Sequence, residues 1–170
     1  MVHFWCIFTS NNKKQFNFSD DYFDLITFAG SLYYAKSQTL LDEVVRVTKK
    51  SSKIIIYDFE LSVDFILENL KLGNVSKQKA HYDHQVNFDG LNEEYIKVVN
   101  NFKNNLSTEI SISNLSHLLL SSKENYYLLL KSLGKEDLYN KLSQKLYSEL
   151  KTEKVLVNTK IYSIVYQNIK

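Results

Sequence analysis

The chain has 170 residues, 44% of them hydrophobic and 24% charged, and a formal net charge of +2. This length predicts a single domain, residues 1–170, that is large enough to bury a hydrophobic core. The basic residues are lysines spread along the sequence, with Arg46 as the one arginine, and this pattern gives no support to nucleic-acid binding.

The first segment, VHFWCIFT at residues 2–9, predicts a strand because it is rich in aromatic and β-branched residues. It lacks the basic start and the small-residue cleavage site of a signal peptide, and no window approaches the roughly 20 apolar residues of a membrane span. The one cysteine, Cys6, excludes an internal disulfide and fits a reducing compartment. We therefore expect a soluble cytoplasmic protein that does not bind membranes.

The next segments predict a strand–helix–strand unit. After a polar loop at 10–22, FDLITFA at 23–29 is apolar on both faces, which is typical of an interior parallel strand. From Ser37 the apolar residues recur at helical spacing as far as the lysines at 49 and 50, and SSKIIIYDFE at 51–60 predicts the second strand. This order and length indicate a βαβ crossover, and such a unit implies a parallel sheet.

The rest of the chain alternates between helical and strand patterns. We expect a helix at 62–72 closed by Gly73, a loop at 74–91, a helix at 92–103, a strand at 107–113, helices at 114–132 and 135–150, and one or two strands at 154–169. The helix at 92–103 is predicted because Asn92 is a natural N-cap and acidic residues follow it.

Ligands bind open parallel sheets at the carboxyl ends of the strands, which directs attention to Phe28–Ser31 and Asp58–Glu60. Gly30 either lets the backbone approach a ligand or makes a tight turn. Tyr33 and Tyr34, just beyond it, either offer a stacking face and a phenol hydrogen bond or pack against the protein. Asp58 and Glu60 flank Phe59 and would share one face of a strand, where they position a substrate amine or hydroxyl, act as a base, or are simply solvated.

The stretch HYDHQ contains two histidines and an acid, His81, Asp83 and His84. Imidazole is a common zinc and iron ligand, so a metal site is one interpretation. The spacing is not specific and no third or fourth ligand is evident, so we expect a lid or a packing role and no metal.

Three segments, FNFSDDYFDLIT, EVVRVTKK and KIIIYDFE, resemble in order and spacing the middle of class I S-adenosylmethionine-dependent methyltransferases. The resemblance covers residues 10 to 60 well and the remainder in outline. It implies an α/β fold, a partial Rossmann-like sheet that is mostly parallel and ends in an antiparallel C-terminal strand. It also implies methyl transfer from S-adenosylmethionine to a small-molecule acceptor.

The resemblance implies a role for several residues. Phe28, Ala29 and Gly30 would lie against the methionine end of the cofactor, and Asn12 and Lys13 would lie next to the adenine. Lys13 departs from the family pattern, which has a small residue there. The acceptor side would be formed by Tyr33, Tyr34 and Asp58. No residue is assigned as catalytic, because proximity and orientation can carry most of the rate of such a transfer.

The family's glycine-rich turn, of the form G-x-G, has no counterpart among Gly30, Gly73, Gly90 and Gly134. The sequence therefore resembles the C-terminal half of a methyltransferase. The alternative function is a non-catalytic methyltransferase remnant that acts as a binding or assembly module. Because the strand at 23–29 would lack its neighbours on one side, we also expect self-association into a homo-oligomer unless residues 2–8 cover that edge.

Overall fold

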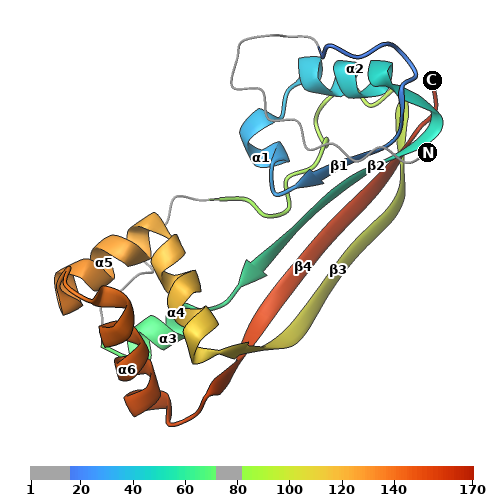
Figure 1. Cartoon of the computed structure of the whole chain (residues 1–170). Helices are drawn as coiled ribbons and strands as arrows, with labels where there is room; N and C mark the ends of the chain where they lie inside the picture. Colours follow the sequence, from blue (N-terminus) through green and yellow to red (C-terminus); the bar gives the residue numbers. More distant parts are fainter. Residues whose placement is uncertain (1–15, 72–81) are drawn as a thin grey trace. The chain divides into compact units, whose positions relative to one another are not determined.

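A computed structural model of the chain describes residues 16–71 and 82–170 (Figure 1). The elements are β1 (Phe23–Ala29), α1 (Leu32–Ala35), α2 (Gln38–Val47), β2 (Thr48–Leu61), α3 (Asp64–Asn69), β3 (Ile96–Ser111), α4 (Ile112–Ser121), α5 (Lys123–Leu133), α6 (Leu138–Leu150) and β4 (Lys154–Asn168).

The four strands form one sheet in the order β1-β2-β4-β3. β1 and β2 are parallel, with Ile26 opposite Ile54 and Phe28 opposite Ile56. β4 runs against β2 and β3, as the strand arrows in Figure 1 show. The predicted α/β fold, with a βαβ unit and an antiparallel C-terminal strand, is confirmed.

The crossover helix α2 begins where the sequence predicts it, but it ends at Val47, and the lysines at 49 and 50 lie in β2. The Ser37 hydroxyl accepts the Leu40 N–H at 3.2 Å, which satisfies one of the donors that a helix N-terminus leaves open. Leu41, Val44 and Val47 share the buried face of the helix. β2 then begins at the residue that follows α2.

The predicted helix at 92–103 is wrong, because β3 occupies this segment from Ile96 onward. The Asn92 side chain accepts the Glu94 N–H at 3.2 Å and so supports a turn instead of starting a helix. β-branched residues at 96, 98 and 99 then favour an extended chain, and the Ile169 N–H donates to the Tyr95 carbonyl at 2.8 Å next to the β3–β4 pair. Pairing with β4 in the sheet therefore outweighs the helical pattern of this segment.

A further boundary differs from the prediction. The helix expected at 114–132 is two helices, because Ser122 is extended and its hydroxyl caps α5 by accepting the Asn125 N–H at 3.4 Å. The segment 154–169, predicted as one or two strands, is one long strand.

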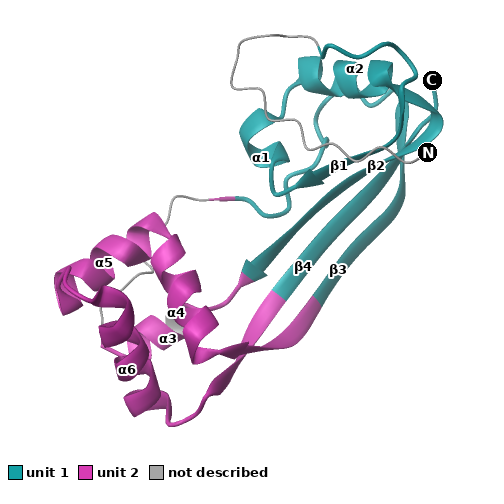
Figure 2. Ribbon diagram, in the orientation of Figure 1, with its two compact units in different colours: residues 1–60, 83–104, 160–170 teal, residues 61–82, 105–159 magenta. Residues whose placement is uncertain are grey.

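The chain divides into two compact units, which Figure 2 colours separately. Unit 1 comprises residues 1–60, 83–104 and 160–170, and unit 2 comprises residues 61–82 and 105–159. The buried core of unit 1 consists of Leu32, Leu41, Val44, Ile54, Ile56, Phe88, Ile96, Ile164 and Tyr166. The core of unit 2 is rich in leucine, with α4, α5 and α6 packed against one another. The single domain expected over 1–170 stays a prediction.

Among the described residues, no helix is long and apolar enough to cross a membrane. The helix expected at 62–72 is shorter, because α3 ends at Asn69 with Leu70 as its C-cap. The strand predicted at 2–9 and Gly73, which was expected to close that helix, lie outside the described residues. The expected self-association, which depends on how the edge of β1 is covered, therefore stays a prediction.

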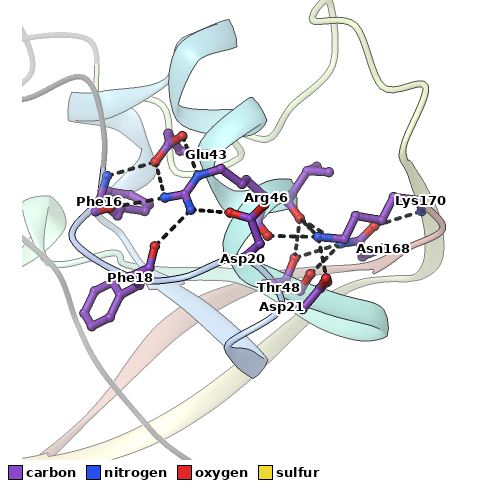
Figure 3. Close-up of polar contacts among 10 residues, drawn as sticks. Phe16, Phe18, Asp20, Asp21, Glu43, Arg46, Thr48, Asn168 and Lys170 are labelled. Carbon is purple, nitrogen blue, oxygen red and sulfur yellow. Dashed lines mark hydrogen bonds and ion pairs between the residues drawn. The ribbon is translucent and has the colours of Figure 1, made fainter.

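Arg46 joins the segment before β1 to helix α2 (Figure 3). Its Nε and one terminal nitrogen donate to the two oxygens of Glu43, both at 2.9 Å. The guanidinium also donates to the carbonyls of Phe16 and Phe18, at 3.1 and 2.9 Å, and to the Asp20 carboxylate at 2.6 Å. Glu43 in turn accepts the Phe16 N–H at 2.8 Å. The hydrogen bond from Arg46 lowers the pKa of the Glu43 carboxyl below its ordinary value.

The C-terminus is attached to the end of the same helix. The Lys170 ammonium donates to the Val45 carbonyl at 2.7 Å and pairs with the Asp21 carboxylate at 2.9 Å. The buried Asn168 amide donates to the Val45 carbonyl and to the Thr48 hydroxyl, at 3.1 and 2.9 Å. The α2–β2 junction is thereby bonded both to the segment before β1 and to the C-terminal residues.

We predict that Arg46→Met lowers the free energy of unfolding by clearly more than the loss of one exposed ion pair, because it leaves the Glu43 carboxylate and two carbonyls without the donor that Arg46 supplies. Arg46→Lys keeps the charge but not the planar fork, so it should recover less than half of that loss. The matched control is Lys49→Met, which removes an exposed pair with Asp24 and should cost no more than about 1 kcal/mol. Denaturant unfolding measures the free energy of unfolding of all three variants. Equal losses for Arg46→Met and Lys49→Met would contradict the structural role of Arg46.

Tyr166 lies in the core of unit 1 with no exposed surface. Its hydroxyl accepts the Phe88 N–H at 3.3 Å, and the two ring centroids are 5.5 Å apart. Burial raises the pKa of the Tyr166 phenol to about 12.

We predict that part of the stability of the protein is lost between about pH 10 and 12 through Tyr166. In the unfolded chain the phenol ionises near its ordinary pKa, so the unfolded state releases the proton first and unfolding becomes easier as the pH rises. Tyr166→Phe should remove roughly 2–3 kcal/mol of this pH dependence. Urea unfolding at several pH values measures it, with Tyr127→Phe controlling for the loss of an exposed tyrosine. Parallel curves for the wild type and Tyr166→Phe would show that the buried phenol plays no part.

Candidate functional site

The carboxyl end of β1 lies beside β2 at the point where Asp58 follows Tyr57. Ala29 is opposite Tyr57 in the parallel register, and the Gly30 N–H donates to the Tyr57 carbonyl at 2.9 Å. Gly30 has a φ of +64°, in the left-handed region that a glycine enters without strain. The segments Phe28–Ser31 and Asp58–Glu60, which the sequence predicts as ligand-binding positions, are therefore neighbours. Asp58 and Glu60 lie within β2, however, and not after its end.

The residues expected on the cofactor side have different environments. Phe28 is half-buried, and its ring meets Phe88 edge-on with centroids 6.0 Å apart, so it packs against the core. Ala29 is exposed, and Gly30 forms the turn. Asn12 and Lys13 lie outside the described residues.

Tyr33 and Tyr34, in the short helix α1, were expected on the acceptor side. Tyr34 is 73% exposed and Tyr33 38%, and their rings meet edge-on with centroids 5.2 Å apart. Of the predicted site residues that the structure describes, Asp58 lines a cavity. Tyr33 and Tyr34 are not among the lining residues of this cavity.

The cavity has a volume of about 280 Å³ and lies within unit 1. Three strands and one loop contribute to it: β2 through Ile56–Asp58, β4 through Tyr162–Ile164, β3 through Asn101–Lys103, and the loop through His84–Asn87 and Asp89. Residues from β2, β4, β3 and the loop thus line one small space, and several of them are polar.

Asp58 and His84, both in the cavity lining, form an acid–histidine pair. The His84 Nδ1 lies 3.2 Å from the Asp58 Oδ2, and the two side chains are 29% and 16% exposed. A carboxylate at this distance accepts the N–H of Nδ1, so the neutral imidazole carries its lone pair on Nε2. The Asp58 Oδ1 accepts the N–H of Phe59 at 2.7 Å, which fixes the carboxylate in turn.

Glu60 lies on the same face of β2 as Asp58, as the spacing predicts. Its carboxylate accepts from the Lys160 ammonium at 3.1 Å and from the Tyr162 hydroxyl at 3.4 Å. Burial, with a smaller contribution from Glu60, raises the pKa of the Tyr162 phenol. Tyr162 therefore enters the cavity as a neutral hydroxyl near neutral pH.

The loop over the cavity is held at several points. Phe88 is fully buried, the Lys36 ammonium donates to the Asp89 carbonyl at 2.7 Å, and the Lys103 ammonium donates to the Gln85 side chain at 2.6 Å. Sequence reasoning considered His84 as a metal ligand or, preferably, as part of a lid or packing segment, and it missed Tyr162 and Lys103. The acid and histidine of the pair are 26 residues apart, so no local spacing signals it.

The metal interpretation of HYDHQ gains no support from the part of the chain that is described. Within it, no group of three or more histidine, cysteine or acidic side chains is arranged to hold a metal ion. His81 lies outside the described residues.

No family model and no curated protein matches this chain. Among solved structures, the chain is similar to a protein from Anaeromyxobacter dehalogenans assigned as a type II methyltransferase, with 10% identity and a TM-score of 0.54 over 89% of this chain and 66% of that one. A protein from Bacillus halodurans assigned as a methyltransferase gives 13% identity and a TM-score of 0.47 over 94% of this chain and 70% of that one.

A geranyl diphosphate C-methyltransferase from Streptomyces coelicolor, in complex with Mg²⁺, geranyl diphosphate and S-adenosyl-L-homocysteine, gives 10% identity and a TM-score of 0.34. The match covers 94% of this chain and 51% of that enzyme. This chain thus spans about half to 70% of the three structures. The likeness to the first of them, together with the strand order, shows that this chain has a methyltransferase-like α/β fold.

Proposed function

We propose that this protein takes part in S-adenosylmethionine-dependent methyl transfer to a small molecule, with the acceptor bound in the cavity beside Asp58. The observation that carries the proposal is the junction of β1 and β2. There the Gly30 turn is bonded to the carbonyl of Tyr57, the residue before Asp58, and both Tyr57 and Asp58 line the cavity. In open α/β sheets ligands bind at the carboxyl ends of neighbouring parallel strands.

The described residues would form one side of the cofactor site. Gly30 has no Cβ and a left-handed backbone, so its main chain would hold the methionine end at close approach. Phe28 is packed against Phe88 and would contribute only from behind this turn. When bound, the cofactor supplies a methyl group on a positively charged sulfur. The role of this chain would then be to hold the acceptor in line with that methyl group, which is where proximity and orientation accelerate a transfer.

The acceptor would meet a polar space. Asp58, His84 and Tyr162 come from three different segments, and each is held by a second residue of unit 1. A site whose side chains are already fixed loses little freedom when a ligand binds, which favours affinity for a small molecule.

The second candidate is a non-catalytic module with the same fold. It is favoured by the glycine pattern, because Gly30, Gly73, Gly90 and Gly134 are far apart and none forms the G-x-G turn of the family that the sequence resembles. Such a module would bind a partner or a ligand without holding the cofactor.

Calorimetry with S-adenosylhomocysteine separates the two candidates. We predict measurable binding by the wild type and a loss of about tenfold or more in Gly30→Val, since a β-branched residue is strained at this φ and its side chain blocks the close approach. Gly134→Ala is the matched control, because Gly134 also has a left-handed φ of +80° but lies in unit 2. The control should bind like the wild type.

The absence of heat at millimolar S-adenosylhomocysteine, for protein shown to be folded by circular dichroism, would contradict methyl transfer and favour the non-catalytic module. Equal affinities for the wild type and Gly30→Val would show that the cofactor does not approach this turn.

A further inference from the structure

We infer that unit 1 has a second binding site, between α2 and the segment that leads into β3, for a small organic ammonium ion with an apolar body. The cavity at this place has a volume of about 240 Å³. Its lining residues and those of the cavity beside Asp58 are different. The inference is therefore independent of the proposed methyl transfer.

Much of the cavity wall is apolar. Leu41 and Ile96 belong to the buried core of unit 1, and Val45 packs against that core. Tyr95 also lines the cavity and is 49% exposed, so about half of its surface is open to a ligand. Burial of apolar surface against these side chains favours a ligand with an apolar body. The volume limits this body to a single small ring with a short chain.

Arg46 lines the cavity, but its charged end is fully engaged. A guanidinium group has five N–H donors. Two of them go to the Glu43 carboxylate, and the others go to the Asp20 carboxylate and to the carbonyls of Phe16 and Phe18 (Figure 3). Two carboxylates thus balance one positive charge, and Arg46 keeps no donor for an anionic ligand. It offers the cavity the methylene groups of its stem instead.

Asp42 supplies the charge that selects the ligand. Its Oδ1 accepts from the neutral side-chain amide of Gln38 at 2.7 Å, and among the described residues this is the one donor that its carboxylate has. The carboxylate therefore keeps its negative charge beside the apolar wall. A carboxylate binds an ammonium ion through charge-assisted hydrogen bonds. The ring of Tyr95 attracts the same cation through its π-electrons.

Gln38 connects the two sides of the cavity. Its side-chain amide donates to Asp42 on the same helix, and its side-chain oxygen accepts the Asn92 N–H at 2.7 Å. The Tyr95 carbonyl accepts the Ile169 N–H at 2.8 Å, which fixes the other end of the segment before β3. The carboxylate and the backbone of Tyr95 are thus held before a ligand arrives, so little freedom is lost on binding.

Three ligands with the same ring test the charge preference of the cavity. The probes are phenethylamine, phenethyl alcohol and hydrocinnamate, which are cationic, neutral and anionic at neutral pH. Each is titrated into the ¹⁵N-labelled full chain, and the amide chemical shifts give both the affinity and the place of binding. We expect the amine to bind roughly three- to tenfold more tightly than the alcohol, with the anion weakest. The largest shifts should occur at Leu41, Asp42 and Tyr95.

Variants test the two side chains that recognise the cation. Asp42→Asn should remove the preference for the amine over the alcohol, because the carboxamide has the same shape without the charge. Tyr95→Ala should weaken the binding of both ligands. The matched control is Asp137→Asn in unit 2, since the Oδ1 of this exposed aspartate also accepts from a side-chain amide, that of Asn140 at 2.6 Å. The control should bind all three ligands like the wild type.

Equal affinities of the wild type for the amine and the alcohol would overturn the inference, and this comparison needs no variant. An amine preference that survives in folded Asp42→Asn would also overturn it. So would shifts that are largest around Asp58 and Gln85, or the absence of shifts with every probe at millimolar concentration. The probes contain no part of S-adenosylmethionine, so a failure here is distinct from a failure of cofactor binding.

Discussion

The contacts of Arg46 are the interaction on which the candidate site depends. The segment from Phe16 to Tyr22 has no regular secondary structure, and its carbonyls at 16 and 18 need donors that the sheet does not supply. Arg46 supplies these donors from the last turn of α2, and its own charge is balanced by Glu43 and Asp20. A planar guanidinium can serve several acceptors at once, which a lysine ammonium cannot do with the same geometry. The one arginine of this lysine-rich chain is therefore structural.

The junction between α2 and β2, where Arg46 lies, also fixes the strands that carry the candidate site. The Asp21 and Tyr22 N–H groups donate to the carbonyls of Arg46 and Val47, so the entry into β1 is fixed against the start of β2. The parallel register then carries this alignment to the other end, where Gly30 meets Tyr57. Asn168 and Lys170 fix β4 at the same junction, and β4 brings Tyr162 and Ile164 to the cavity.

The sequence predicts much of this fold and only part of the site. β1, α2 and β2 are predicted in the right order because their apolar patterns are strong and local, although the α2–β2 boundary lies earlier than expected. Asp58, which lines the cavity, can be singled out because it lies at the end of an apolar run. The segment from Asn92 is assigned wrongly because its N-cap pattern is also a turn pattern, and the pairing of β3 with β4 outweighs it. His84 and Tyr162 come to Asp58 from distant parts of the chain, and a single sequence contains no signal for such contacts.

The central claim is that the β1–β2 junction and the adjoining cavity form one binding site. The most direct measurement is a titration of ¹⁵N-labelled protein with S-adenosylhomocysteine, followed by amide chemical shifts. The account predicts the largest changes at Gly30, Ser31 and Asp58, with residues of α4–α6 unaffected. Changes concentrated in α4–α6, with Gly30 and Asp58 unmoved, would contradict it.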